Sequence, residues 1–414
     1  MENNFNINKK IIDLSKIAIE KCKDQFTKID KIKEYNEQKM LKAFQNANVN
    51  LSSFSGSNGY GYDDIGRDKL DQIYSYMFDS EDSLVRHNFV SGTHTLSVAL
   101  FGVLRPGDKV LCITGEPYDT LLPVIGIKEG SGSLKEFGIE FDCIDLSSDD
   151  FDYDEITNKL KSEYKMIYIQ RSKGYSSRYS ITIEKLEKIT KYIRNLNKDI
   201  IIFLDNCYGE FIDYKSPIAV GVDLMAGSLI KNAGGGISQT GGYITGKKEL
   251  VEMCSYRLTT PSTGKEIGCT LNTLRDMYLG AYFAPISSAE ALKTAVFASC
   301  LFELLDFDVS PKYNEDRGDI VEVIFLQNKE NIELFCKGIQ KGSFIDSSVT
   351  PSAAPMPGYD NDVIMASGSF TLGSSIELSA DAPIREPYCV YLQGGLSFNT
   401  SKVGIMIAAS NLIK

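Results

Sequence analysis

Apolar and polar residues follow different patterns along the first quarter of the chain. Residues 9–48 place apolar side chains at helical spacing among many Lys, Glu and Asp residues, which predicts one or two amphipathic helices. Residues 52–67 are rich in Gly, Ser and Tyr and predict a loop, after which residues 67–80 return to helical spacing. The small, apolar run at 91–104 predicts a loop that enters a buried helix, which the Arg-Pro-Gly-Asp turn at 105–108 ends.

Beyond this turn, short apolar segments alternate with helical ones. Helical spacing occurs at 119–127 and 183–197, and a long helix is predicted at 286–305. The segments that resemble buried strands are 109–114, 141–146, 165–170, 200–205 and 241–246. This alternation is typical of an α/β domain with a mostly parallel sheet and helices on both faces. We therefore predict a helical arm at 1–58, a large α/β domain at 59–300 and a small α+β domain at 301–414.

Composition narrows the classes of protein that the chain can belong to. With 414 residues, 43% hydrophobic and 24% charged, it can bury a sizeable core. A net charge of −11 argues against binding nucleic acids or anionic membranes through bulk electrostatics. The nine cysteines form no C-x-x-C pair, and we expect reduced thiols in a cytoplasmic protein. Neither a signal peptide nor a membrane span is predicted, and only two histidines are present, so no histidine-rich metal site is expected.

The chemistry is concentrated in two consecutive segments. Asp205 ends an apolar strand, and ligands of parallel sheets lie beyond such strand ends. Lys231 follows in a stretch of small residues, where burial would lower the pKa of its amine. A carboxylate and such a lysine suit pyridoxal phosphate, because the lysine can form a Schiff base with the aldehyde and the acid can keep the ring nitrogen protonated. For Asp205, capping of the following turn is the alternative.

A phosphate site is predicted from two further segments. The small residues 91–94 open a helix, where backbone N–H groups favour an anion and Gly92 allows a close approach. Ser228, three residues before Lys231, would add a hydroxyl donor. His94 is interpreted as a structural residue.

Several other residues have both a functional and an ordinary interpretation. Tyr118, after a strand and a Pro turn, could stack on the cofactor ring or act as an acid or base, although the chain has 22 tyrosines. The loop carrying Tyr60, Tyr62 and Arg67 could reach a phosphate in a partner subunit, or be a Gly-rich surface loop.

Two arginines are candidates for a carboxylate partner. An amino-acid substrate needs a bidentate donor, and both Arg385 and Arg171 could supply it. Arg171 could also face the ring hydroxyl of the cofactor. Ordinary salt bridges are the alternative for both.

These segments together resemble the fold-type I pyridoxal-phosphate enzymes. More closely, the chain is similar to the aluminium-resistance or methionine gamma-lyase family, relatives of the cystathionine lyases. The stretches that carry the resemblance span residues 59 to 396: G-Y-G-Y-D-D-I-G-R-D, F-V-S-G-T-H, L-R-P-G-D, G-E-P-Y-D-T, I-Q-R-S-K-G-Y-S-S-R, D-N-C-Y-G-E-F, S-L-I-K-N-A-G-G-G-I, T-G-G-Y-I-T-G and Y-L-Q-G-G-L. Ala233 stands where the family usually has proline, and Q-R-S-K-G-Y replaces an Asn-Pro turn of the better-studied gamma-lyases.

The resemblance implies a role for each candidate. Lys231 would form the internal aldimine, Asp205 would face the ring nitrogen, and Tyr118 would stack on the ring. Gly92, Thr93 and Ser228 would hold the phosphate. The resemblance also implies a homodimer or homotetramer in which the loop at 59–67 crosses to the neighbouring site.

The sequence therefore predicts a pyridoxal-phosphate carbon–sulfur lyase that acts on cystathionine, methionine or cysteine. Two alternatives remain open. The first keeps the cofactor and changes the reaction to aminotransfer or aldol cleavage. The second is a non-catalytic protein that binds a phosphate-containing ligand through the glycine-rich segments.

Overall fold

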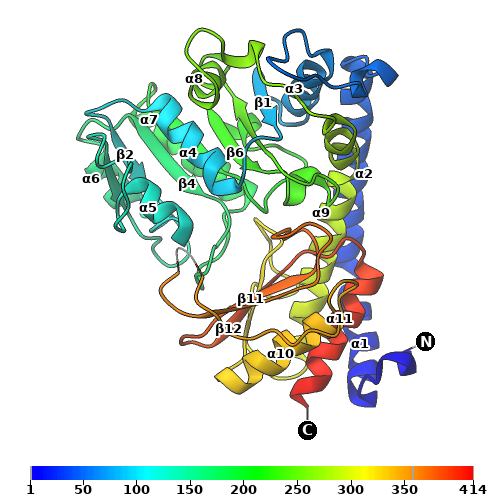
Figure 1. The fold of residues 1–414 in the computed structure, drawn as a ribbon. Helices are drawn as coiled ribbons and strands as arrows, with labels where there is room; N and C mark the ends of the chain where they lie inside the picture. Colours follow the sequence, from blue (N-terminus) through cyan, green and yellow to red (C-terminus); the bar gives the residue numbers. More distant parts are fainter. Residues whose placement is uncertain (1, 357–358, 414) are drawn as a thin grey trace.

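Two β-sheets, one large and one small, organise the chain (Figure 1). The computed structural model describes residues 2–356 and 359–413. The strands of the large sheet are β1 (Asp82–Arg86), β2 (Lys109–Cys112), β3 (Glu140–Cys143), β4 (Met166–Gln170), β5 (Ile201–Asp205), β6 (Leu224–Ser228) and β7 (Gly242–Gly246). The strands of the small sheet are β8 (Val309–Ser310), β9 (Glu322–Phe325), β10 (Val363–Ser367), β11 (Ser379–Pro383) and β12 (Cys389–Gln393).

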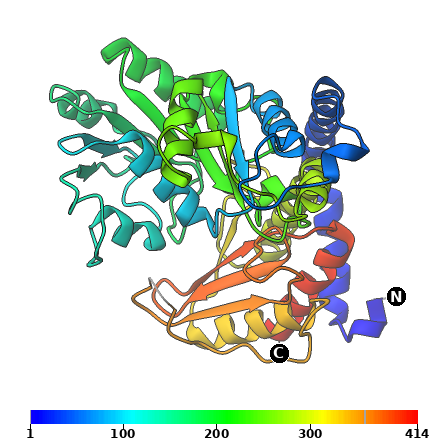
Figure 2. The ribbon, with the colours of Figure 1, turned by 45° about the horizontal axis from the view of Figure 1, so that its top comes forward.

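Helices make up most of the remaining ordered structure. They are α1 (Lys9–Lys21), α2 (Lys23–Asn46), α3 (Ile65–Met77), α4 (Gly92–Val103), α5 (Leu122–Ile125), α6 (Tyr153–Lys159), α7 (Ile183–Leu196), α8 (Lys248–Leu258), α9 (Leu274–Glu303), α10 (Lys329–Lys341) and α11 (Phe398–Leu412). The prediction of one or two helices over 9–48 is confirmed by α1 and α2, which meet at Cys22. Helix α2 runs beside α9 in both views (Figures 1 and 2).

The large sheet has the strand order β1-β7-β6-β5-β4-β2-β3. Strands β2 to β6 are parallel to one another, whereas β7 runs antiparallel to both β6 and β1. The predicted α/β class with a mostly parallel sheet is confirmed. Strand β6, which carries Ser228, was not expected as a strand because none of its residues is β-branched or aromatic and three of them are small.

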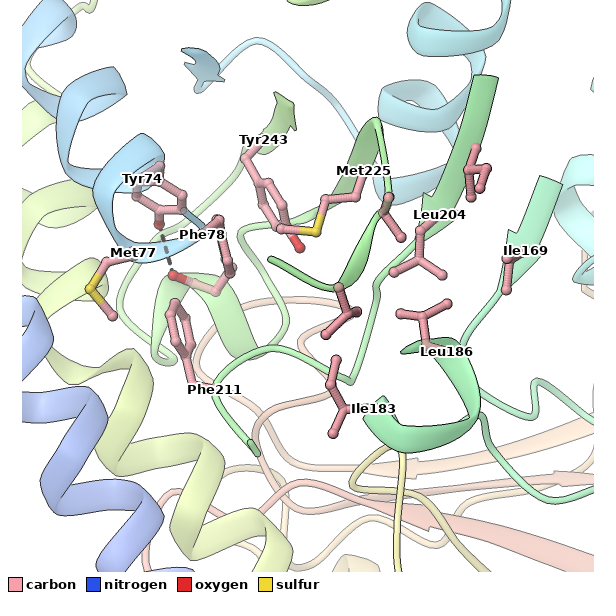
Figure 3. Close-up of a cluster of buried hydrophobic side chains, with 14 of the residues drawn as sticks. Tyr74, Met77, Phe78, Ile169, Ile183, Leu186, Leu204, Phe211, Met225 and Tyr243 are labelled. Atoms are coloured by element: carbon pink, nitrogen blue, oxygen red, sulfur yellow. Dashed lines mark hydrogen bonds between the residues drawn. The ribbon is translucent and has the colours of Figure 1, made fainter. Parts of the chain in front are cut away.

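Side chains of the large sheet alternate between two hydrophobic cores, as the pleat of a strand requires. On one face, Ile169, Leu204, Met225 and Tyr243 pack against α3, α7 and α9, and Figure 3 shows this cluster. On the other face, Tyr168, Phe203, Ala226 and Ile244 pack against α4 and α8. Helices on both faces leave the strand ends as the open edge where a ligand can lie.

The small sheet is antiparallel, in the order β10-β11-β12-β9-β8. One of its faces packs against α9, α10 and α11 through Ala380, Ala382, Val390 and Leu392. Helix α9 begins twelve residues before the predicted start at 286, so that it passes from the large sheet to the small one. The helix predicted at 119–127 is much shorter, a 3-10 turn followed by the four residues of α5.

Among the residues described, no helix has the length and apolar character needed to cross a membrane.

Candidate active site

Lys231 lies in the turn that follows β6, at the edge of the large sheet. Its ammonium nitrogen lies over the ring of Tyr208, 4.1 Å from the ring centroid. The neighbouring Asn232 donates its side-chain N–H groups to the carbonyl oxygens of Tyr208 at 3.1 Å and Glu210 at 3.2 Å. These two hydrogen bonds hold the turn that carries Lys231, the lysine turn, against the turn that follows β5.

Asp205 ends β5 and is 6% exposed. Its Oδ1 accepts a hydrogen bond from the backbone N–H of Cys207 at 3.0 Å, so the turn-capping role is present beside any functional one. Burial raises the pKa of Asp205, and the charge of Lys231 opposes this rise. The structure thus brings Asp205 and Lys231 together at the carboxyl ends of the neighbouring strands β5 and β6.

The expected lowering of the pKa of Lys231 is wrong for this structure. Burial lowers it, but Cys207, Tyr208, Asp205 and Glu210 together raise the pKa above its ordinary value. Negative charge near an ammonium group favours the charged form, and here this effect exceeds desolvation.

The start of α4 lies against Ser228, as the phosphate prediction requires. A Cβ built on Gly92 would lie 3.5 Å from the Cβ of Ser228 and 3.7 Å from the sulfur of Cys207. Ser91 caps the helix by accepting from the N–H of His94 at 3.0 Å, and Thr93 shares a hydrogen bond of 2.6 Å with Thr120. Gly92 and Thr93 therefore lie near Ser228, and His94 Nδ1 accepts from the N–H of Val90.

Tyr118 belongs to a group of four tyrosines. Its N–H donates to Gln170 Oε1 at 2.7 Å, and its hydroxyl shares a hydrogen bond with that of Tyr359. Its ring lies edge-on to Tyr175, with centroids 5.4 Å apart, and Tyr175 stacks on Tyr391 at 4.9 Å. Burial raises the pKa of Tyr118, so its hydroxyl keeps its proton at neutral pH.

The two candidate arginines have different surroundings. Arg171 is 1% exposed and donates to Gly209 O at 2.6 Å and to Asn206 Oδ1, and it also pairs with Asp213. Its guanidinium is thereby committed to protein groups, and the structure does not bring it to Lys231. Arg385 is exposed and donates to Tyr175 O at 3.3 Å.

Within one chain, the loop at 59–67 packs against Gly268 and Cys269. Tyr60 and Tyr62 are 73% and 61% exposed. Tyr60 O accepts from Gly268 N at 2.9 Å, and buried Arg67 donates to Gly61 O and Gly268 O. The role of this loop in a partner subunit's site stays a prediction.

Several residues around Lys231 and Tyr118 were missed by sequence reasoning. Tyr208 and Glu210 lie in the turn after Asp205. Because this turn follows a predicted strand end, the sequence could have marked both as candidate site residues. Tyr359 and Asp381 come from the small domain, where no local pattern marks them.

The donor set fits pyridoxal phosphate. A buried carboxylate, a lysine amine and a hydroxyl beside a glycine at a helix start are the groups that its ring nitrogen, aldehyde and phosphate need. The missing side chain at Gly92 leaves the helix N-terminus open toward Ser228.

Known proteins resemble this chain along its whole length. A carbon–sulfur lyase involved in aluminium resistance from Clostridium novyi NT is 50% identical with a TM-score of 0.95, covering 99% of this chain and 98% of that one. A proposed cystathionine beta-lyase involved in aluminium resistance from Clostridium acetobutylicum is 47% identical with a TM-score of 0.96, covering 100% and 98%. The uncharacterised protein YnbB of Bacillus subtilis is 47% identical over 93% of this chain and 92% of its own length.

A more distant relationship places the fold. The pyridoxal-5'-phosphate dependent protein YhfS from Escherichia coli shares 13% identity at a TM-score of 0.62, over 91% of this chain and 95% of that one. The fold is therefore that of the fold-type I pyridoxal-phosphate enzymes. The methionine gamma-lyase family matches residues 11–413, and the chain belongs to that family.

Proposed function

We propose that this chain is a pyridoxal-phosphate carbon–sulfur lyase that eliminates a thiol from a sulfur amino acid. The proposal rests on one observation: Lys231, Asp205 and Ser228 lie close together at the carboxyl ends of β5 and β6 in the large sheet. Membership of the methionine gamma-lyase family supports it, as do the carbon–sulfur lyase and proposed cystathionine beta-lyase among the similar structures.

Each part of the cofactor has a proposed partner. Lys231 would hold the aldehyde carbon, Asp205 would keep a proton on the ring nitrogen, and Ser228, Gly92 and Thr93 would hold the phosphate. When bound, pyridoxal phosphate supplies an electron sink that makes the Cα proton of an amino acid acidic.

The protein's own groups then move protons and hold the substrate. The amine of Lys231 would remove the Cα proton of the substrate. Tyr118, whose hydroxyl remains protonated, gives its proton to the leaving sulfur. Arg385 pairs with the substrate carboxylate. With one water consumed, the products are a thiol, a 2-oxo acid and ammonia.

The cofactor assignment is tested by borohydride reduction. Protein supplied with pyridoxal phosphate should show the absorbance of the bound cofactor, and peptide mapping after reduction should place it on Lys231. Lys231→Ala should lose both signals. If that variant keeps them, the lysine assignment fails.

The reaction is tested separately by measuring products. Thiol and 2-oxo acid should appear together from cystathionine, methionine or cysteine. Formation of pyridoxamine phosphate without thiol would favour aminotransfer, and release of an aldehyde from a β-hydroxy amino acid would favour aldol cleavage. Absence of any product with the cofactor bound would favour the non-catalytic alternative.

A further inference from the structure

Asp381 is a carboxylate of the small sheet that the proposed reaction does not use. Its neighbours Ala380 and Ala382 point into the core against the helices. Because side chains alternate along a strand, Asp381 lies on the opposite face of β11, where Tyr391 is its register partner on β12. Tyr391 in turn stacks on Tyr175 of the large domain, so this face is turned toward the lysine site.

The surroundings of Asp381 contain few donors. Gln393 Nε2 donates to its Oδ2 at 2.9 Å. Within residues 2–356 and 359–413, no Lys, Arg or His forms a salt bridge with it. Burial raises its pKa, and Tyr175, Gln393 and the charge of Lys231 oppose the rise. Asp381 is half-buried, and its hydrogen-bond partner is an amide, while Lys231 acts on it only through its charge.

Aromatic groups lie beside this carboxylate. Tyr175 is 5.5 Å from Tyr359 and 5.4 Å from Tyr118, measured between ring centroids. The buried hydroxyl of Tyr175 has no hydrogen-bond partner of good geometry among the described residues. Tyrosine faces attract cations, and the ammonium of Lys231 already lies over Tyr208. The tyrosine rings and a carboxylate that forms no salt bridge together make a surface that is complementary to positive charge.

Space for a substrate side chain is present along the same surface. A cavity of about 370 Å³ is bordered by Tyr175, Tyr391, Pro383 and Arg385. Pro383 lies two residues after Asp381 and therefore on the same face of β11. The cavity lies beside Tyr175 and Tyr391, and Tyr391 is the register partner of Asp381.

We propose that Asp381 binds an ammonium group carried by the leaving thiol, which makes thioether amino acids with a second amino group the preferred substrate class. The assignment rests on the proposed lyase function. Cystathionine belongs to this class because its leaving thiol is itself an amino acid. Methionine and cysteine do not, because their leaving groups carry no ammonium.

The test compares two substrates that differ only in the distal ammonium. Cystathionine and its deamino analogue, S-(carboxypropyl)-cysteine, are given to the cofactor-loaded enzyme, and thiol release is followed. The wild type should prefer cystathionine by at least about tenfold in kcat/KM, since a hydrogen bond between charged groups is worth this much. In Asp381→Asn that ratio should fall close to unity, whichever way each separate rate changes.

Asp346→Asn is the matched control, because Asp346 is an exposed carboxylate of the same domain, and it should keep the wild-type ratio. Asp381→Ser replaces the Asn variant if the latter does not fold, with the same expectation. A ratio near unity in the wild type, or the wild-type ratio retained in whichever Asp381 variant folds, overturns the assignment.

Failure of the lyase function would look different. If the loaded wild type releases no thiol from these two compounds, nor from methionine or cysteine, the proposed reaction is wrong, whereas release from methionine or cysteine alone overturns only the Asp381 assignment. Calorimetric titration of the two compounds then decides about Asp381 alone: tighter binding of cystathionine that Asp381→Asn abolishes supports the assignment, and equal binding overturns it.

Discussion

The hydroxyl of Tyr243 donates to Glu210 Oε1 at 2.9 Å, directly behind the lysine turn. The other oxygen of Glu210 is buried and has no hydrogen-bond partner among the described residues. Burial raises the pKa of Glu210 to about 7, while the hydrogen bond from Tyr243 and the charge of Lys231 oppose the rise. An acid so placed takes up a proton that it would release in the unfolded chain.

Glu210→Gln should therefore reduce the pH dependence of stability. A pKa raised from 4.5 to about 7 stabilises the fold below the lower value, and this contribution is lost as the pH rises through the upper one. The free energy of unfolding of the wild type should fall between about pH 5 and about pH 8. In the Gln variant this fall should be smaller, by up to about 3 kcal/mol. Urea unfolding at both pH values measures this.

The exposed Glu249→Gln is the control and should behave as the wild type does. Burial also raises the pKa of Glu322 to about 7. The stability of the Glu210→Gln variant should therefore keep part of the pH dependence of the wild type. Identical pH slopes in Glu210→Gln and the wild type would contradict the prediction.

Asp205→Asn should keep the cofactor and lose the reaction. Without the carboxylate, a proton on the ring nitrogen is no longer favoured, and kcat for thiol release should fall about a hundredfold or more. Cofactor absorbance and steady-state kinetics on the same sample measure both properties. A variant with wild-type kcat would leave Asp205 only its turn-capping bond to Cys207.

Tyr118→Phe should discriminate between leaving groups. A thiolate needs a proton to leave, so release from a thioether should fall about a hundredfold, whereas elimination of chloride from β-chloroalanine needs no acid and should change little. Tyr214→Phe, which alters an exposed tyrosine, should affect neither substrate. Equal losses on both substrates would assign Tyr118 to positioning rather than proton transfer.

Gly92→Ala should weaken cofactor binding without weakening the fold. The added Cβ makes ordinary contacts with Ser228 and Cys207, so the Tm of the protein without cofactor should be unchanged. The methyl group narrows the approach to the helix N-terminus, and affinity for pyridoxal phosphate should fall about tenfold. Fluorescence titration measures the affinity, and an unchanged value would place the phosphate elsewhere.

The loop at 59–67 should act across a subunit boundary in a homodimer or homotetramer. Lys231→Ala and the double variant Tyr60→Ala/Tyr62→Ala should each be inactive alone. After subunit exchange in an equimolar mixture, about one quarter of the wild-type activity should return, because each mixed dimer then holds one intact site. A monomeric mass by light scattering, or no recovery, would contradict this.

Local patterns were enough to predict much of the fold. The capped start of α4, the buried strand β5 and the position of Asp205 at its end all depend on residues that are neighbours in the sequence. Strand β6 was missed because Met-Ala-Gly-Ser carries no strand signal of its own, and it forms between the neighbouring strands β5 and β7.

Long-range packing explains what could not be predicted. The pKa of Lys231 was expected to fall because only burial was considered, whereas Asp205, Cys207, Tyr208 and Glu210 come from a preceding turn that folding brings against it. Asp381 faces the site only because the small sheet packs its alanine face on the helices. Neither the raised pKa of Lys231 nor the orientation of Asp381 can be predicted from the spacing of residues that are neighbours in the sequence.

Helix α9 contacts both the turn after Lys231 and the core of the small sheet. Its first half touches the glycines after Lys231, where Ser287 donates to Gly235 O at 2.9 Å, and its second half lies in the core beneath the small sheet. The two halves of α9 thus lie against the lysine turn and in the core of the small sheet. Movement of the small sheet relative to the lysine turn would therefore require α9 to bend, and Pro285, which lacks a backbone N–H, stands where a helix bends most easily.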